Sequence, residues 1–220
     1  MITIAQTVQQ LLAEHPFIPE AMTAGLINHS ALARQLIPEI EKRLHKKVEP
    51  GAVIMSLKRF SPQAELSNHV RIRKIMKNVG EVIVRSNLSR ITFQNTDSLF
   101  EKLNRTLSIQ KASRDVMFTY VRGVFETTLI GSSPYLQMLT PSLKKEKILV
   151  QNNHLSSVTL TLPKDNMDQP GLYNFILRQI AWEGINIREV ISTSNEFTVI
   201  VSEKDVDKAF SVMNGMKKIH

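Results

Sequence analysis

A loop in the last third of the sequence carries residue types that suit a small zwitterionic ligand. Pro170 and Gly171 let the chain turn sharply onto a helix predicted to begin at Leu172. The first N–H groups of a helix have no partner inside the helix, so they can receive a ligand carboxylate. Asp168, which precedes the turn, can receive an ammonium group. Together these groups suit a free amino acid.

Two residues beyond this predicted helix extend the pattern. Gly184 is a good C-cap, and Asn186 begins the next predicted strand, where its amide can serve a ligand or a neighbouring chain. A purely structural interpretation is also open, because turns and helix caps use the same residue types.

The segment that must position these residues has the pattern of a small α/β unit. Apolar residues follow strand or helix spacing in turn over 158–162, 172–180, 185–191, 197–201 and 206–213. The resulting order of strand, helix, strand, strand, helix is typical of a ferredoxin-like unit, in which two helices cover one face of an antiparallel sheet. The other face needs a cover too, and we expect a second copy or another chain to provide it.

The preceding segment, 80–151, repeats this order with a weaker signal. Its predicted elements are two strands within 81–94 that turn at Ser86-Asn87, a helix over 97–107, paired strands over 116–121 and 124–130, a short helix over 133–143 and a closing strand at 148–150. No Pro-Gly precedes its helix, and residues 94–97 take that place. We therefore expect a structural partner without a ligand site of its own.

A family resemblance rests on the sequence motifs of the last segment and on the spacing between them. The stretch 166–172, Asn-Met-Asp-Gln-Pro-Gly-Leu, followed by a helix and by 183–187, Glu-Gly-Ile-Asn-Ile, resembles the ACT domain of aspartate kinases. The residues 194–196, Ser-Asn-Glu, fall where that family has a Ser-Glu pair, although Asn195 stands where serine is common. The resemblance covers about sixty residues as an ordered set.

The resemblance implies an amino-acid effector at an interface between paired ACT units, held by the loop before the first helix and by the second strand. It also implies a homodimer formed through those units. Carried over to this sequence, it implies ligand contacts from Asn166, Met167, Asp168, Gly171, Leu172, Asn186, Ile187 and Glu196.

The first 79 residues are predicted to form a separate helical domain. Ser30 is the expected N-cap of a helix that contains Pro38, a residue that should kink or restart it, and Pro50 opens a further helix. The spacing of apolar residues over 70–79 fits a helix and a strand equally well.

This N-terminal domain has two functional interpretations. In the first, it resembles the helix-turn-helix of winged-helix regulators and binds double-stranded DNA. Ser56, Lys58 and Arg59 would then lie near DNA, with phosphate contacts from Arg71, Arg73, Lys74 or Lys77. In the second, it is a small helical domain for dimerisation.

Charge is distributed unevenly along the 220 residues, whose formal net charge is +8. Lys and Arg number 11 against 6 Asp and Glu in residues 1–80, 10 against 6 in 81–150, and 7 against 8 in 151–220. A basic N-terminal region joined to a neutral ligand-binding segment is compatible with a partner that carries phosphates. An ordinary solvated basic surface explains the same numbers.

Several classes of chemistry are excluded or disfavoured. The absence of cysteine excludes disulfides, thiolate metal sites, iron–sulfur clusters and a cysteine nucleophile. The six histidines are scattered, so we expect no metal site and no cofactor. No phosphate-binding loop, dinucleotide fingerprint or serine nucleophile elbow is present, and the chain has no room for a kinase domain, so we expect no catalytic residue.

The sequence therefore predicts an α+β protein with three parts: a helical domain over 1–79, a degenerate ACT-like unit over 80–151 and an ACT domain over 152–220. In the first interpretation, the helical domain is a winged-helix domain. Both ACT-type units are expected to have the βαββαβ order. We expect a non-enzymatic, cytoplasmic regulator that responds to an amino acid and has no membrane segment, with transcription as its target. The alternative is a stand-alone regulatory subunit acting on a separate amino-acid biosynthetic enzyme.

Overall fold

The computed structural model describes residues 2–15, 17–60, 63–109 and 116–218. The chain divides into two compact units, Met1–Arg71 and Ile72–His220, which we call the helical unit and the sheet unit. Within the described ranges, no helix is both long enough and apolar enough to cross a membrane.

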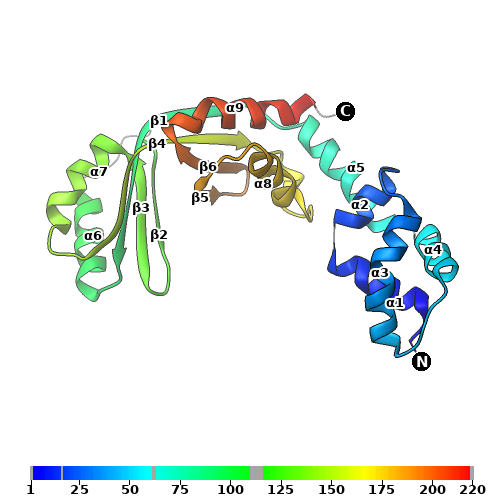
Figure 1. Cartoon of the computed structure of the whole chain (residues 1–220). Helices are drawn as coiled ribbons and strands as arrows, with labels where there is room; N and C mark the ends of the chain where they lie inside the picture. The colour runs from blue at the N-terminus through cyan, green and yellow to red at the C-terminus, as the bar shows by residue number, and fades with distance from the viewer. Residues whose placement is uncertain (1, 16, 61–62, 110–115, 219–220) are drawn as a thin grey trace. The chain divides into compact units, whose positions relative to one another are not determined.

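The helical unit is built from α1 (Ile4–Glu14), α2 (Phe17–Thr23), α3 (His29–Leu44), α4 (Pro50–Arg59) and the first part of α5 (Gln63–Lys77) (Figure 1). Its core is formed by the apolar sides of α1, α3 and α4: Val8, Leu11, Leu12, Leu32, Ala33, Leu36, Ile40, Val53 and Leu57 are all buried. No strand occurs among the described residues of this unit. The described residues of this unit therefore do not form the β wing of a winged-helix domain. Apolar residues recur at helical spacing in each of its elements, so each element is a helix.

Two details of α3 differ from the prediction. Its N-cap is Asn28, not Ser30, because the Asn28 side chain accepts hydrogen bonds from the N–H groups of Ser30 and Ala31. The helix also continues through Pro38 without a break. Pro38 lies on the exposed side, where water can satisfy the carbonyl group that proline leaves unpaired.

Residues 70–77, for which helix and strand were both open, belong to α5. Ile72, Ile75 and Met76 are buried against the core of the sheet unit. Arg73 and Lys74 are exposed and belong to the sheet unit by position. The helical unit itself then carries only eight Lys and Arg against six Asp and Glu, so much of the predicted N-terminal positive charge lies outside it.

The sheet unit is a single six-stranded antiparallel sheet with strand order β2-β3-β1-β4-β6-β5. Its first elements are β1 (Val82–Gln94), α6 (Asp97–Ile109), β2 (Phe118–Arg122), β3 (Glu126–Ser132), α7 (Ser133–Leu139) and the 3₁₀ turn η1 (Thr140–Leu143). Then come β4 (Ile148–Thr161), η2 (Lys164–Asn166), α8 (Leu172–Trp182), β5 (Ile187–Ser192), β6 (Glu196–Ser202), η3 (Glu203–Asp205), α9 (Val206–Gly215) and η4 (Met216–Lys218).

Strands β1 and β4 pair along most of their length and are shared by two ferredoxin-like halves. The middle subdomain contains the second part of β1, α6, β2, β3, α7 and the first part of β4. The C-terminal subdomain contains the second part of β4, α8, β5, β6 and α9. Its fourth strand is the first part of β1, in which Val82 pairs with Leu160 and Arg85 with Ser157. Each half therefore completes its sheet with a strand segment from the other.

The predicted turn at Ser86-Asn87 is wrong, because β1 runs through these residues as one strand. The register slips by one residue between Arg85 and Leu88, and Asn87 has a left-handed backbone with φ of 56°. An extra residue of this kind is a β-bulge, and asparagine tolerates the left-handed conformation better than most residues. The bulge allows residues on both sides of it to face the helices, which a regular alternation would prevent.

The two faces of the sheet are both partly covered within one chain. On β6, Val199 and Val201 face the core beneath α8 and α9, whereas Ile200 points to the opposite face. There Ile200 joins a buried cluster with Leu88, Ile130 and Leu155. Helices α6, α7 and α9 lie on the outer side of the curled sheet (Figure 1), and this cluster lies on the face that the helices do not cover. Part of the face for which we expected an external cover is thus closed by the curl itself.

Replacing Gly131 of β3 by alanine should destabilise the sheet unit by about 2 kcal/mol, since overpacking at a rigid contact costs this much. A Cβ at this position would lie 2.7 Å from the backbone oxygen of Met117, which cannot rotate away. Gly51 of α4 offers a control, because a Cβ there meets nothing within 4 Å. Urea denaturation, monitored by hydrogen exchange in each unit, should show a loss of stability for Gly131→Ala and no loss for Gly51→Ala. Equal losses of stability in the two variants would contradict the packing argument.

Candidate functional site

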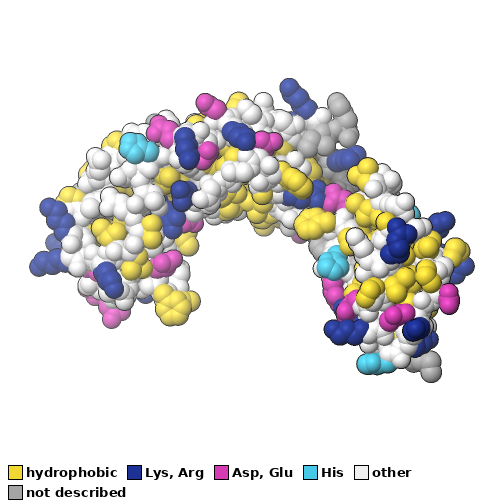
Figure 2. Space-filling model, viewed as in Figure 1, with side chains coloured by type: hydrophobic (Ala, Val, Ile, Leu, Met, Phe, Trp, Pro, Cys, Tyr) yellow, Lys and Arg dark blue, Asp and Glu magenta, His cyan; other side chains and the backbone are white. Residues whose placement is uncertain are grey.

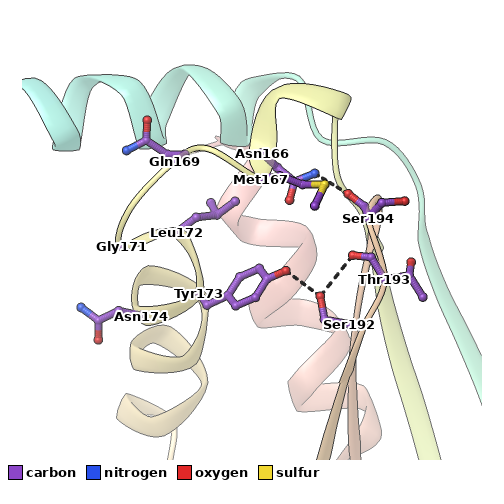
Figure 3. Close-up of a pocket in the computed structure, with 10 residues that line it drawn as sticks. All are labelled: Asn166, Met167, Gln169, Gly171, Leu172, Tyr173, Asn174, Ser192, Thr193 and Ser194. Atoms are coloured by element: carbon purple, nitrogen blue, oxygen red, sulfur yellow. Dashed lines mark hydrogen bonds between the residues drawn. The ribbon is translucent and has the colours of Figure 1, made fainter.

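An open pocket of about 670 Å³ lies in the C-terminal subdomain. It is formed by the loop between β4 and α8, the first turn of α8 and the turn between β5 and β6 (Figure 3). Its lining residues are Asn166, Met167, Gln169, Gly171, Leu172, Tyr173, Asn174, Ser192, Thr193 and Ser194.

The first turn of α8, which lines this pocket, has unpaired N–H groups. Gly171 is the N-cap residue with a left-handed backbone, φ 82°, and it brings no side chain that could cap the helix. The first backbone hydrogen bond of the helix runs from the N–H of Phe175 to the oxygen of Gly171. The N–H groups of Leu172, Tyr173 and Asn174 therefore have no acceptor within the helix and suit an anionic ligand group.

Asn166 is buried at the pocket with a side chain that is only half satisfied. Its Nδ2 donates to the carbonyl oxygens of Pro163, at 2.7 Å, and Ser194, at 2.8 Å. The bond to Ser194 ties the loop to the β5–β6 turn, and the bond to Pro163 lies within the loop. Its Oδ1 is buried and has no hydrogen-bond partner within the described part of the chain. Because leaving a buried acceptor unpaired costs free energy, this oxygen favours a ligand that brings a donor.

A hydroxyl pair closes the side of the pocket between helix and strand. Tyr173 on α8 and Ser192 on β5 lie 2.6 Å apart through their oxygens (Figure 3). The Tyr173 ring packs against buried Phe197 with centroids 5.0 Å apart, so its position is fixed by the core.

The structure brings together only part of the predicted ligand set. Four predicted residues line the pocket: Asn166, Met167, Gly171 and Leu172. Asp168 belongs to the same loop but is exposed and does not line the pocket. Glu196 begins β6 just beyond the lining turn.

Asn186 and Ile187 lie at the opposite end of β5 from the pocket. Ile187 pairs with Val201, whereas Ser192 pairs with Phe197. Asn186 is six residues from Ser192, a distance of about 20 Å along an extended strand. Within one chain these two predicted residues therefore do not reach the pocket.

Six lining residues were missed by the sequence reasoning: Gln169, Tyr173, Asn174, Ser192, Thr193 and Ser194. The last three lie in the polar turn that the sequence did predict. A usable signal was the strand order of the ferredoxin-like unit, because antiparallel pairing of β4 with β6 places that turn beside the loop that follows β4.

At the corresponding place in the middle subdomain, an asparagine makes a fuller set of hydrogen bonds. Asn95 donates from Nδ2 to the carbonyls of Gly123 and Val124 in the β2–β3 turn, as Asn166 does to Ser194. Its Oδ1, unlike that of Asn166, accepts a hydrogen bond from Thr127. The Asn95 side chain therefore has partners for both its amide nitrogen and its oxygen within its own chain.

The predicted DNA-contacting residues are distributed over both units. Lys58 and Arg59 are exposed at the end of α4, but the Ser56 hydroxyl donates to the oxygen of Ala52 in its own helix. Of the α5 residues, Arg71 ends the helical unit, and Arg73 and Lys74 fall in the sheet unit; all three are exposed.

Among the described residues, no group of three or more His, Cys, Asp and Glu side chains is arranged to hold a metal ion.

Comparison with known proteins gives structural matches alone. No protein-family model matches the sequence, and no curated protein does either. The ligand-free regulatory subunit of aspartate kinase from Thermus thermophilus matches with a TM-score of 0.50 and 14% identity over 63% of this chain and 97% of that chain. Aspartokinase α and β subunits match with a TM-score of 0.50 and 14% identity over 64% of this chain and 99% of theirs.

A longer enzyme chain gives the same result over part of its length. Aspartate kinase from Clostridium acetobutylicum matches with a TM-score of 0.53 and 18% identity, over 64% of this chain but 35% of the enzyme. The matched 64% of this chain is close to the share of the sheet unit, which makes up about two thirds of the chain. The sheet unit has the fold of the regulatory ACT region of aspartate kinases.

Proposed function

We propose that this protein is a non-enzymatic regulator that binds a free amino acid in the pocket of its C-terminal subdomain. The observation that carries the proposal is the buried, unpartnered Oδ1 of Asn166 in the same pocket as the open N-terminus of α8. The helix end suits a carboxylate and the amide oxygen suits an ammonium group, so one α-amino acid satisfies both.

The resemblance of the sequence and the shared fold support the regulatory part of this proposal. The solved neighbours that lack a kinase domain are described as regulatory subunits of aspartate kinase.

Binding is tested by offering the full-length protein a pool of the twenty standard amino acids. We expect slower hydrogen exchange in the loop from Pro163 to Leu172, because a ligand would stabilise it. We also expect a calorimetric stoichiometry of one ligand per chain, because the Oδ1 of Asn95, at the corresponding place in the middle subdomain, already accepts a hydrogen bond from Thr127. No change in exchange and no heat with any amino acid would refute the proposal.

We also propose that two copies pair through their ACT-type halves. The predicted ligand residues Asn186 and Ile187 lie too far along β5 to reach their own pocket. They can contribute to a ligand site only if a second copy places its strand beside the loop. Sedimentation of the full-length protein should then show a dimer that the ligand stabilises.

For the output of the helical unit, docking on a partner protein is better supported than DNA binding. Phe17 and Leu26, which are 63% and 80% exposed, offer apolar side chains to a partner surface. The N-terminal residues of a recognition helix contact base edges in the major groove. The first residues of α4 are Pro50, Gly51 and Ala52, whose side chains have no hydrogen-bonding groups for such contacts.

Binding to double-stranded DNA is the second candidate, because Lys58, Arg59 and Arg71 are exposed cations. A duplex titration at two salt concentrations separates the two outputs. Binding through phosphate contacts must weaken steeply as salt rises. If the protein does not bind the duplex at low salt, docking on a partner protein stays the proposed output. Strong, salt-dependent and sequence-selective binding would show that the output is DNA binding and not docking.

A further inference from the structure

We infer that the ligand of this pocket is an amino acid whose side chain is uncharged and carries a hydroxyl or amide group. The inference rests on the proposed amino-acid binding and adds the ligand class that this particular lining selects. Serine, threonine, asparagine and glutamine are the standard amino acids of this class.

The first argument is the absence of charge from the pocket wall. None of the ten lining residues is Asp, Glu, Lys, Arg or His. The helix N-terminus can stabilise one carboxylate, and neutral oxygens such as Asn166 Oδ1 can accept from one ammonium group. A second charge on the ligand would lose hydration in the pocket without meeting an opposite charge.

The charges just outside the wall favour neither sign of ligand strongly. Asp165, Asp168 and Glu196 are exposed around the loop and the turn, and Lys164 is the cation in the same loop. Water screens exposed charges, so these groups neither repel an acidic ligand strongly nor give a basic ligand a strong partner. Selection by charge therefore depends on the neutral wall.

The second argument is the orientation of the hydroxyl pair. The oxygen of Ser192 lies 3.3 Å from the backbone oxygens of both Thr193 and Glu196, as well as 2.6 Å from the Tyr173 oxygen. A carbonyl oxygen only accepts, and Ser192 has one hydroxyl proton to donate. When Ser192 donates to a carbonyl, Tyr173 must donate to Ser192. The Tyr173 oxygen then keeps lone pairs for a donor on the ligand, which a hydroxyl or an amide supplies.

The test is a calorimetric titration of the full-length protein with four ligand groups. These are the neutral polar set named above, the acids aspartate and glutamate, the bases lysine and arginine, and the apolar set alanine, valine and leucine. We expect at least one neutral polar amino acid to bind tenfold or more tightly than every acidic and basic one. A charged amino acid that binds as tightly or more tightly would overturn this inference and leave the proposed function intact. Failure of all groups to bind would refute the proposed function itself.

A conservative variant tests the hydroxyl argument separately. Tyr173→Phe should weaken binding of the preferred polar ligand about tenfold, the effect of losing one hydrogen bond, and leave binding of alanine unchanged within about twofold. Tyr120→Phe is the matched control, because Tyr120 is 43% exposed, close to the 41% of Tyr173, but lies in the middle subdomain. Equal weakening of polar and apolar ligands by Tyr173→Phe, or no effect on either, would overturn the assigned role of this hydroxyl.

Discussion

Glu146→Ala is expected to destabilise the middle subdomain by about 3 kcal/mol, as the loss of a buried, hydrogen-bonded carboxylate does. The Glu146 side chain is 3% exposed and accepts hydrogen bonds from three groups. Thr96 and Ser98 donate at 2.8 Å each, and the Lys102 ammonium forms an ion pair. Because Thr96 also caps α6 by accepting from the N–H of Leu99, the carboxylate fastens the helix start to the chain that enters β4.

The same carboxylate should make the stability of this half depend on pH. The hydrogen bond from Lys102, followed by that from Thr96, lowers the pKa of Glu146 below its ordinary value of 4.5. A carboxyl group whose pKa is lower in the folded state stabilises the fold above its unfolded pKa, and this contribution is lost as pH falls through the folded pKa. The stability difference between the natural protein and Glu146→Gln should therefore be constant above pH 4.5 and shrink below it.

Hydrogen exchange of peptides from α6 and β3, measured as urea is raised, gives the stability of this half separately from the helical unit. Glu101→Ala is a suitable control, since Glu101 is exposed on the same helix. Loss of stability below 1 kcal/mol for Glu146→Ala, or the same pH dependence in Glu146→Gln and the natural protein, would contradict the role of this carboxylate as an anchor.

Asn166→Ala should abolish ligand binding, with affinity at least about a hundredfold lower, because it removes a pocket acceptor and also loosens the loop. The carbonyls of Pro163 and Ser194 both lose their donor, and the loop should become about 2 kcal/mol less stable. Calorimetry measures the first effect, and hydrogen exchange over the loop measures the second.

Asn95→Ala is the matched control for this experiment. Asn95 makes the same kind of contact to the β2–β3 turn of the middle subdomain, where no ligand is proposed. The substitution Asn95→Ala should therefore lower the stability of the middle subdomain to a similar extent. Ligand affinity should stay within about threefold of the natural value. If Asn95→Ala abolished binding as well, or Asn166→Ala left it intact, the ligand would not occupy the proposed pocket.

Much of the local structure follows from the sequence. The Pro-Gly turn onto α8, the helix end before Gly184 and the polar turn after β5 were all predicted, since each depends on residues close together in the chain. Four pocket residues came from this local information, Asn166, Met167, Gly171 and Leu172. For residues 70–77 the sequence left helix and strand open. The tertiary structure shows a helix, in which Ile72, Ile75 and Met76 pack into one core.

Only the tertiary structure decided how the two halves are joined. Local pattern predicted a turn at Ser86-Asn87, because asparagine and serine favour turns, but pairing of β1 with β4 along its length converts that turn into a bulge. The fourth strand of the C-terminal subdomain then comes from residues 82–85, about seventy residues before the rest of that half. No local pattern carries this information, because pairing partners far apart in the sequence are selected by burial of both faces at once.

The pocket shows the same division. The loop and its helix start were determined by the sequence alone, whereas the unpaired state of Asn166 Oδ1 was decided by the β5–β6 turn, which occupies Nδ2 and offers no donor to the oxygen. In the middle subdomain, Thr127 supplies that donor to Asn95 and leaves nothing for a ligand. The same residue type is thus a closed structural contact in one half and an open acceptor in the other, because hydrogen-bond satisfaction depends on neighbours that only the fold assembles.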